Sequence, residues 1–93
     1  MLRIHVEKEC ESITIRVEGR IEGEVVQELE RCCQEVLAQS KNCRLIIELD
    51  EVMSIDGEGW TLLQRMSRTG IDLHGKGLHS QDLVERLRMP KAG

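Results

Sequence analysis

The fold is decided by residues 45–66, which are LIIELDEVMSIDGEGWTLLQRM. Residues 45–49 form a nearly continuous apolar run, which predicts a strand covered on both faces, as in a sheet flanked by helices. Asp50 and Glu51 end this run, and an extended apolar segment, 52–55, follows it. The stretch then changes to the helical period, with an apolar side made of Trp60, Leu62, Leu63 and Met66.

This helix has a signal at each of its ends. Asp56 is placed to cap its start, because a carboxylate there accepts hydrogen bonds from the free backbone N–H groups and complements the helix dipole. Gly70 is placed to close the helix in the left-handed conformation that glycine adopts readily. We therefore predict a helix that begins just after Asp56 and ends just before Gly70.

Two strands and a helix are predicted on the N-terminal side of this stretch. Residues 2–7 and 12–18 alternate apolar and polar side chains, and the short polar link between them favours an antiparallel hairpin. Residues 19–23 have glycine at both ends and predict a break. A helical pattern begins at Glu24 and ends near Ser40, with an acidic outer face and an apolar stripe of Val25, Val26, Leu29, Cys32, Cys33, Val36 and Leu37.

On the C-terminal side, residues 71–74 predict one more short strand and residues 75–77 a turn. Ser80 is expected to cap a third helix, whose apolar stripe is Leu83, Val84 and Leu87. The element order is β-β-α-β-α-β-α, and strand–helix–strand repeats imply parallel neighbours with right-handed crossovers. We expect an α/β fold: a mixed sheet of about four strands with an N-terminal antiparallel hairpin and about three helices, in a single domain over residues 1–93.

Composition restricts the classes of partner. The 93 residues include 13 Lys and Arg, 17 Asp and Glu, one Trp and neither Phe nor Tyr, and the acidic excess lies in residues 1–51. The lack of a basic cluster and of stacking side chains argues against nucleic-acid binding. No apolar run approaches the ~20 residues that span a bilayer, and residues 1–5 lack the apolar region of a signal peptide. We expect a cytoplasmic protein without membrane insertion.

The cysteines and histidines favour a structural role over a chemical one. Cys32 and Cys33 are neighbours in a predicted helix, where their side chains point about 100° apart and cannot bridge. Cys10 and Cys43 complete no C-x-x-C pair, and the three histidines show no zinc spacing. We favour structural or incidental thiols over a redox or metal role, and expect no metal and no cofactor.

The loop at residues 55–60 is the candidate functional site, because ligands and partners of open α/β sheets dock between strand ends and helix starts. It lacks the glycine pattern of dinucleotide sites and the Lys-Ser/Thr of a P-loop, and Asp56 and Glu58 would repel a phosphate. No nucleophile, oxyanion donor or metal set stands near these carboxylates, so we expect no enzyme activity. The structural alternative is a helix cap with a glycine-rich turn.

The loop resembles the signature loop of STAS domains, the family of bacterial anti-sigma-factor antagonists. The family pattern, Asp-Ser-Ser-Gly before a Leu-rich helix, is similar to Asp56-Gly57-Glu58-Gly59 followed by Trp60, and residues 19–22 resemble the turn that precedes the family's first helix. The likeness extends over residues 2–89 in element order. It implies a cytoplasmic regulator of transcription whose partner is an anti-sigma factor or a related regulatory kinase.

Two positions depart from the family pattern. Gly57 occupies the position of the serine that is phosphorylated in switched members, and Glu58 replaces the second hydroxyl. Neither side chain accepts a phosphoryl group, so we expect no phosphorylation at this loop. Glu58 places one negative charge where a phosphate would add about two, which makes it at most a partial mimic of the modified state.

We therefore expect a non-enzymatic protein-interaction module whose partner-binding residues are Asp56, Gly57, Glu58, Gly59 and Trp60. Trp60 is either the anchor of the interface or part of the core. The acidic face of the helix after Glu24 is either a solvated surface or a second partner contact. A small-ligand-binding or transport-accessory STAS module is the alternative function, and the short chain leaves a homodimer possible.

Overall fold

A computed structural model describes residues 2–39 and 42–88 of the chain. The described part is an α/β fold with the predicted order β-β-α-β-α-β-α, and it contains a mixed four-stranded sheet and three helices. The elements are β1 (Leu2–Lys8), β2 (Ser12–Ile21), α1 (Glu24–Gln39), β3 (Arg44–Ile55), α2 (Gly57–Arg68), β4 (Asp72–Lys76) and α3 (Leu78–Arg88). Ser40, where the first helix was expected to end, lies outside the described residues.

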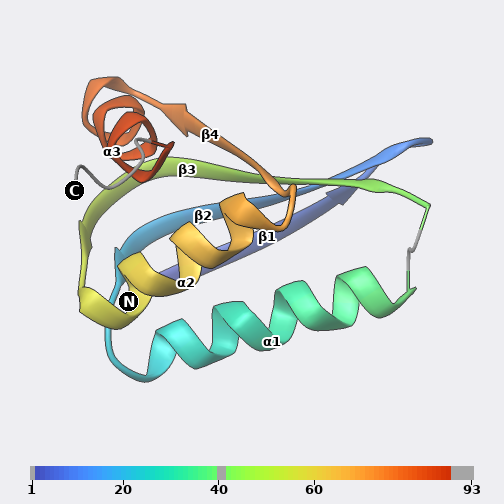
Figure 1. Ribbon diagram of the computed structural model, residues 1–93, viewed down its shortest axis with the longest axis horizontal. Helices are drawn as coiled ribbons and strands as arrows, with labels where there is room; N and C mark the ends of the chain where they lie inside the picture. Colours follow the sequence, from blue (N-terminus) through green and yellow to red (C-terminus); the bar gives the residue numbers. More distant parts are fainter. Residues whose placement is uncertain (1, 40–41, 89–93) are drawn as a thin grey trace.

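The sheet has the strand order β1-β2-β3-β4 (Figure 1). β1 and β2 form the predicted antiparallel hairpin, while β2, β3 and β4 are parallel neighbours. Because α1 and α2 are both crossovers to the next strand in the same direction, right-handed connections place both helices on one face of the sheet. Figure 1 shows α1 and α2 running past the strands, with α3 beside β3 and β4.

The core lies between the helices and one face of the sheet. In β3, Leu45, Ile47 and Leu49 are buried, while Ile46 and Glu48 between them are only half-buried. The prediction that this strand is covered on both faces is therefore wrong. Its other face belongs to a polar sheet surface, on which Arg16 of β2 pairs with Glu48 at 3.5 Å.

Two predicted breaks are strand irregularities instead. β3 continues through Asp50 and Glu51 to Ile55, and β2 continues past Gly19 to Ile21. The register shifts between Val17 and Arg20, where β3 carries extra residues against β2. Gly19 has a φ of 109° and Glu51 a φ of 53°, and such positive φ values occur at β-bulges. A positive φ is unfavourable for a residue with a Cβ, so the backbone at Glu51 is strained.

The start of α3 also differs from the prediction. The helix begins at Leu78, so Ser80 lies in its first turn and is not its cap. Ser80 is buried, and its Oγ accepts a hydrogen bond from the backbone N–H of Val52 at 3.3 Å. Gly75 of β4 makes this close packing possible, because a Cβ there would lie 2.5 Å from the backbone oxygen of Ser80. The sequence therefore suggested a helix cap at Ser80, whereas its side chain forms a hydrogen bond to β3.

The prediction for the end of α2 is confirmed. The helix ends at Arg68, Thr69 is its C-cap, and Gly70 follows with a φ of 97°. Across residues 2–39 and 42–88, none of the helices has the length and hydrophobicity needed to span a bilayer.

Candidate functional site

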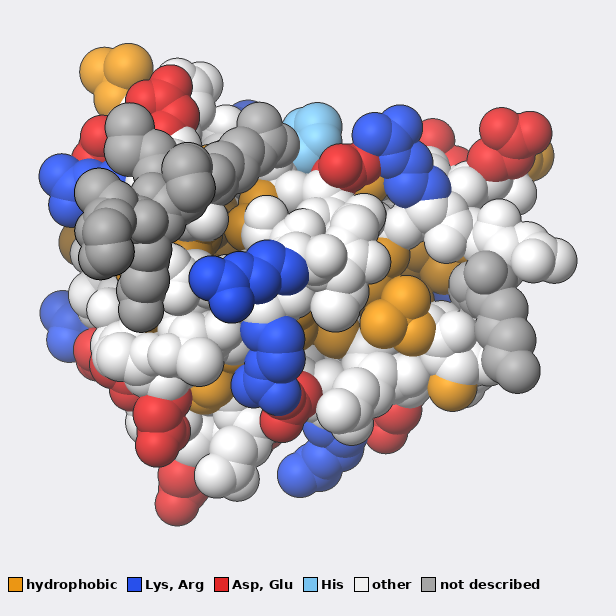
Figure 2. Space-filling view, in the orientation of Figure 1, with side chains coloured by type: hydrophobic (Ala, Val, Ile, Leu, Met, Phe, Trp, Pro, Cys, Tyr) orange, Lys and Arg blue, Asp and Glu red, His pale blue; other side chains and the backbone are white. Residues whose placement is uncertain are grey.

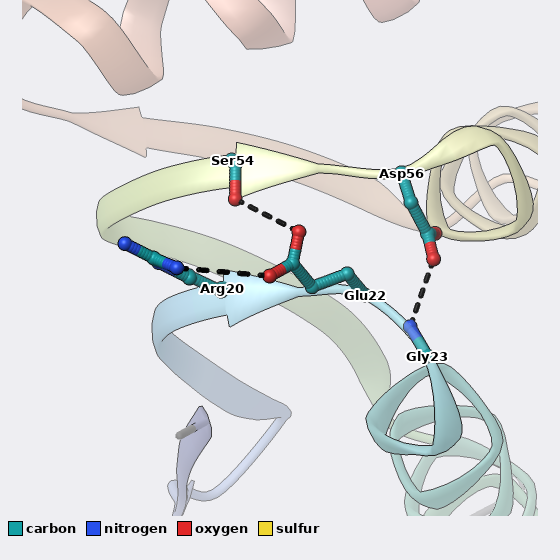
Figure 3. A network of polar contacts seen from close by, with 5 residues as sticks. All are labelled: Arg20, Glu22, Gly23, Ser54 and Asp56. Carbon is teal, nitrogen blue, oxygen red and sulfur yellow. Dashed lines mark hydrogen bonds and ion pairs between the residues drawn. The ribbon is translucent and has the colours of Figure 1, made fainter.

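Asp56 joins the starts of two helices. It is the N-cap of α2, as predicted, and its Oδ1 accepts a hydrogen bond from the backbone N–H of Gly59 at 2.7 Å. Its Oδ2 accepts one from the backbone N–H of Gly23, just before α1, at 2.8 Å (Figure 3). These backbone donors, Gly23 first and then Gly59, lower the pKa of the Asp56 carboxyl. The ionised carboxylate therefore holds the β3–α2 loop against the start of α1.

The two glycines of the loop have different roles. A Cβ on Gly59 would lie 2.8 Å from the backbone oxygen of Ile21 and 2.9 Å from the Cγ2 of that residue. Gly59 is buried, so its close approach is to the end of β2 within the same chain. Gly57 is exposed, and a Cβ on it would have nothing within 4 Å. Only Gly57 therefore leaves backbone open to another molecule.

The remaining predicted site residues divide between surface and core. Glu58 is exposed and makes no ion pair within the described residues. Trp60 is half-buried and packs against the core. The interpretation of Trp60 as part of the core is therefore met in part, and its role as the anchor of an interface stays a prediction.

Hydroxyl groups next to the loop are held by hydrogen bonds inside the chain. The Oγ of Ser54 donates to Glu22 at 3.3 Å, and Arg20 lies 4.0 Å from the same carboxylate (Figure 3). The Oγ1 of Thr61 donates to the backbone oxygen of Gly57 at 2.9 Å. The Ser54 hydroxyl thus links β3 to the residue that follows β2, and the Thr61 hydroxyl bonds to the first residue of α2.

A groove between α1 and α2 joins the loop to the acidic helix. Its end nearest the loop has a volume of about 550 Å³, with Gly57, Glu58 and Thr61 on one wall and Gln27 and Glu30 on the other. A smaller hollow of about 140 Å³ continues toward the ends of the helices and shares Glu30 and Arg65 with it. Arg65 and Glu30 form an ion pair at 3.4 Å across the groove. We call this continuous surface the helix groove.

The helix groove has an apolar floor and charged rims. Val26 and Leu62 are buried beneath its loop end, and Cys33 and Met66 are buried beneath its far end. Figure 2 shows acidic side chains gathered along the lower margin of this face, over α1, with hydrophobic side chains visible between the helices. Such a surface offers apolar contact in the centre and charge at the edge, as protein-docking surfaces do.

A second hollow lies beside the irregular parts of β2 and β3 and the carboxyl end of β4, and the sequence did not indicate it. It has a volume of about 880 Å³ and contains no residue of the 55–60 loop. We call it the strand-end groove, and its lining includes Arg3, Glu51, Met53, Lys76 and Leu78. Met53 is 67% exposed and Leu78 is 88% exposed, although both are large apolar side chains. Met53 belongs to the apolar segment 52–55 that the sequence predicts as extended. In the register of β3 with β2 it lies between the paired residues Val52 and Ser54, where the register shifts.

The four cysteines differ in how far they are buried. Cys33 is buried, and burial raises the pKa of its thiol to about 12, with Cys32 and Glu30 adding to the shift. Burial also raises the pKa of the half-buried Cys32, followed by the charge of Glu35. Cys10 is exposed and Cys43 half-buried, and all four thiols are free. Because their pKa values are raised, the thiols of Cys32 and Cys33 stay protonated near neutral pH. In the part of the chain that the structure describes, no set of three metal-binding side chains occurs.

Comparison with known proteins returned no matching family model and no matching curated protein. The assignment of a function therefore depends on the residues and geometry of the chain itself.

Proposed function

We propose that this chain is a non-enzymatic STAS-like interaction module that binds a regulatory protein through the 55–60 loop and the helix groove. The partner class is an anti-sigma factor or a related regulatory kinase. The observation that supports this most directly is that exposed Gly57 and Glu58 share one groove with Gln27 and Glu30 of α1. Two predicted contact surfaces, the loop and the acidic helix, thereby form one continuous surface.

The partner segment is expected to be apolar on one side and basic at one end. The apolar floor of the helix groove matches a hydrophobic strip, and Glu58 at the rim favours Lys or Arg on the partner. Glu30 is already engaged with Arg65, so a partner cation competes with that pair. Trp60, which follows Gly59 in α2, packs against the core.

Binding is proposed to be independent of phosphorylation at the loop. Gly57 has no acceptor group, and Glu58 carries a permanent charge that no phosphatase removes. The hydroxyls of Ser54 and Thr61 take part in hydrogen bonds with Glu22 and the Gly57 backbone. The module would therefore be controlled by its own abundance or by its partner.

A pair of matched substitutions tests the docking surface. The tagged chain is used to isolate partners, the captured protein is identified and purified, and its affinity is measured by calorimetry. Glu58→Lys is expected to weaken binding about tenfold, because it reverses a charge at the rim of the groove. Glu85→Lys makes the same change on the exposed part of α3 and should leave affinity unchanged. Equal affinities for the two variants would contradict the proposal.

Gly57→Ser tests the missing switch. The open space around Gly57 accepts a serine side chain without a clash. If the isolated partner is a kinase, this variant is expected to become phosphorylated and to release it, while wild type does neither. A phosphorylated variant that keeps full affinity would contradict the proposal that this loop corresponds to the phosphorylation switch of STAS domains.

The strand-end groove supports a second candidate, a small-ligand or transport-accessory module. Its volume of about 880 Å³ is within the range of small-molecule sites, and exposed Met53 and Leu78 supply apolar contact. A thermal-shift screen of nucleotides and lipids tests it. A stabilising ligand whose effect is lost in Met53→Glu but kept in Glu58→Lys would favour this candidate over protein docking.

A further inference from the structure

Among the residues that the structure describes, no strand pairs with the outer edge of β1. β1 lies at one end of the sheet, and β2 is its neighbour on the other side. An edge strand leaves backbone N–H and C=O groups directed away from the sheet, where they can pair with another strand. β1 spans seven residues, Leu2–Lys8, which is long enough for a regular ladder. The side chains along this edge therefore determine what can add to it.

The side chains of β1 divide by face. Arg3 is opposite Glu18 in the register with β2, which places Arg3, His5 and Glu7 on the polar face of the sheet. Ile4 and Val6 are opposite the buried Val17 and Ile15, so they lie on the helix-covered face. Val6 is 42% exposed there, and no strand within residues 2–39 and 42–88 lies beyond it.

We propose that two copies of this chain join edge to edge through β1, antiparallel and centred on His5, to form one continuous sheet. In this register Arg3 lies opposite Glu7 of the second copy, and the two-fold axis repeats that pair. Ile4 lies opposite Val6 of the second copy on the other face, also twice. Opposite charges and apolar side chains placed directly across an antiparallel pair both stabilise it.

Antiparallel pairings centred on the residues next to His5 place less compatible side chains opposite each other. The sequence of β1 therefore favours the pairing centred on His5. Centring the pair on Ile4 would place Arg3 opposite His5, and centring it on Val6 would place Ile4 opposite Lys8. Only the His5 register pairs the whole of residues 3–7 with itself while matching charge with charge and apolar with apolar.

The charges already present on this face are compatible with the pairing. Arg3 is exposed and makes no ion pair within residues 2–39 and 42–88. Glu7 lies 3.2 Å from Arg16 in the same chain, so Arg3 of a second copy would be the second cation at that carboxylate. Arg16 is also paired with Glu48, so the carboxylate of Glu7 can form a further ion pair with Arg3 of the second copy.

Sedimentation of the full chain tests the dimer and its register. Wild type is expected to dimerise reversibly as concentration rises. Arg3→Glu, which sets two carboxylates against each other twice, should raise the dimer dissociation constant about tenfold, and Arg3→Glu/Glu7→Arg should restore it to within about threefold. Arg31→Glu makes the same charge change on the exposed surface of α1 and should have no effect. A wild type that stays monomeric, or a double variant no better than Arg3→Glu, would overturn the proposal.

Disulfide trapping gives an independent reading of the same register. In a Cys10→Ser background, His5→Cys places two thiols directly opposite, where Cα atoms of an antiparallel pair are about 4.5–5.5 Å apart and can be bridged. Mild oxidation should convert this variant to a covalent dimer. His74→Cys, exposed on β4, is the control and should remain uncrosslinked. Equal crosslinking of the two variants would contradict pairing through β1. This proposal does not depend on partner docking at the helix groove.

Discussion

The helix groove and the strand-end groove are built in different ways. The helix groove lies between two regular helices, and Asp56 ties the start of α2 to the residue before α1. The strand-end groove is formed where β3 is irregular, with Glu51 at a φ of 53° and Met53 turned outward. Irregular backbone persists only where its surroundings enforce it, and such positions gather at functional sites. The contrast separates a docking surface shaped by side chains from a hollow shaped by the backbone.

Gly75→Ala is expected to cause the largest loss of stability, because its new Cβ would meet backbone atoms of α3 at the shortest distance. Gly75 lies on the side of the strand-end groove. The new Cβ would lie 2.5 Å from the backbone oxygen of Ser80 and 2.7 Å from the backbone nitrogen of Gln81. Backbone atoms cannot turn aside as a flexible side chain can, so α3 must shift, at a cost of about 3 kcal/mol. Urea unfolding measures the change. An unchanged midpoint would show that α3 can move away from β4 without cost.

Gly59→Ala is the corresponding change at the helix groove. Its Cβ would meet the backbone oxygen of Ile21 at 2.8 Å, and the expected loss is about 2 kcal/mol, since alanine's higher helix propensity offsets part of the clash. Gly57→Ala is the matched control, because its Cβ meets nothing within 4 Å. It should be neutral or slightly stabilising in the same urea experiment. Equal losses for the two variants would mean that the loop does not pack on β2 as described.

Glu51→Gly is expected to stabilise the protein. A left-handed conformation costs roughly 1–2 kcal/mol for a residue with a Cβ, and the greater freedom of glycine in the unfolded chain reduces the net gain to about 0.5 kcal/mol. Glu51→Ala keeps the Cβ and should give no such gain. If the strand-end groove binds a ligand, Glu51→Gly should also weaken that binding while raising stability. A loss of stability in Glu51→Gly would show that its side chain outweighs the strain.

Asp56→Asn is expected to have the smallest effect, and one that depends on pH. Because hydrogen bonds lower the folded-state pKa of Asp56, its carboxylate stabilises the fold above the unfolded-state pKa of about 3.9. The advantage of wild type over the asparagine variant should disappear as the pH falls through the lower, folded-state pKa. Unfolding in urea across this pH range measures it, with Glu85→Gln on exposed α3 as the control. A difference that persists at the lowest pH would contradict a role for the ionised carboxylate.

The features predicted correctly depend on residues close in the chain. The β1–β2 hairpin follows from alternation on both sides of a short link, and the start of α2 follows from a carboxylate at Asp56. The apolar stripe of α1 placed Val26, Leu29 and Cys33 in the core. For the candidate site, the sequence identified the loop and the acidic helix as separate features. Each of these signals is local, so no knowledge of the packing was needed.

The features that were missed depend on contacts between distant segments. Ile46 made the start of β3 appear apolar throughout, although Glu48 marks a face that the helices do not cover. Ser80 has the residue type of a cap, but the nearby Val52 N–H is its partner. The strand-end groove depends on extra residues in β3 opposite Gly19, and no local pattern indicated where the register would shift.

By itself the sequence determined the element order, the apolar stripe of α1 and the capped loop at residues 55–60, because hydrophobic period and capping chemistry act within a few residues. Only the tertiary structure decided that Gly59 faces Ile21 while Gly57 faces solvent, and that the loop shares a groove with α1. It also decided that Met53 is exposed. The physical reason is that burial and close approach are properties of pairs of segments, which strand register and helix placement bring together.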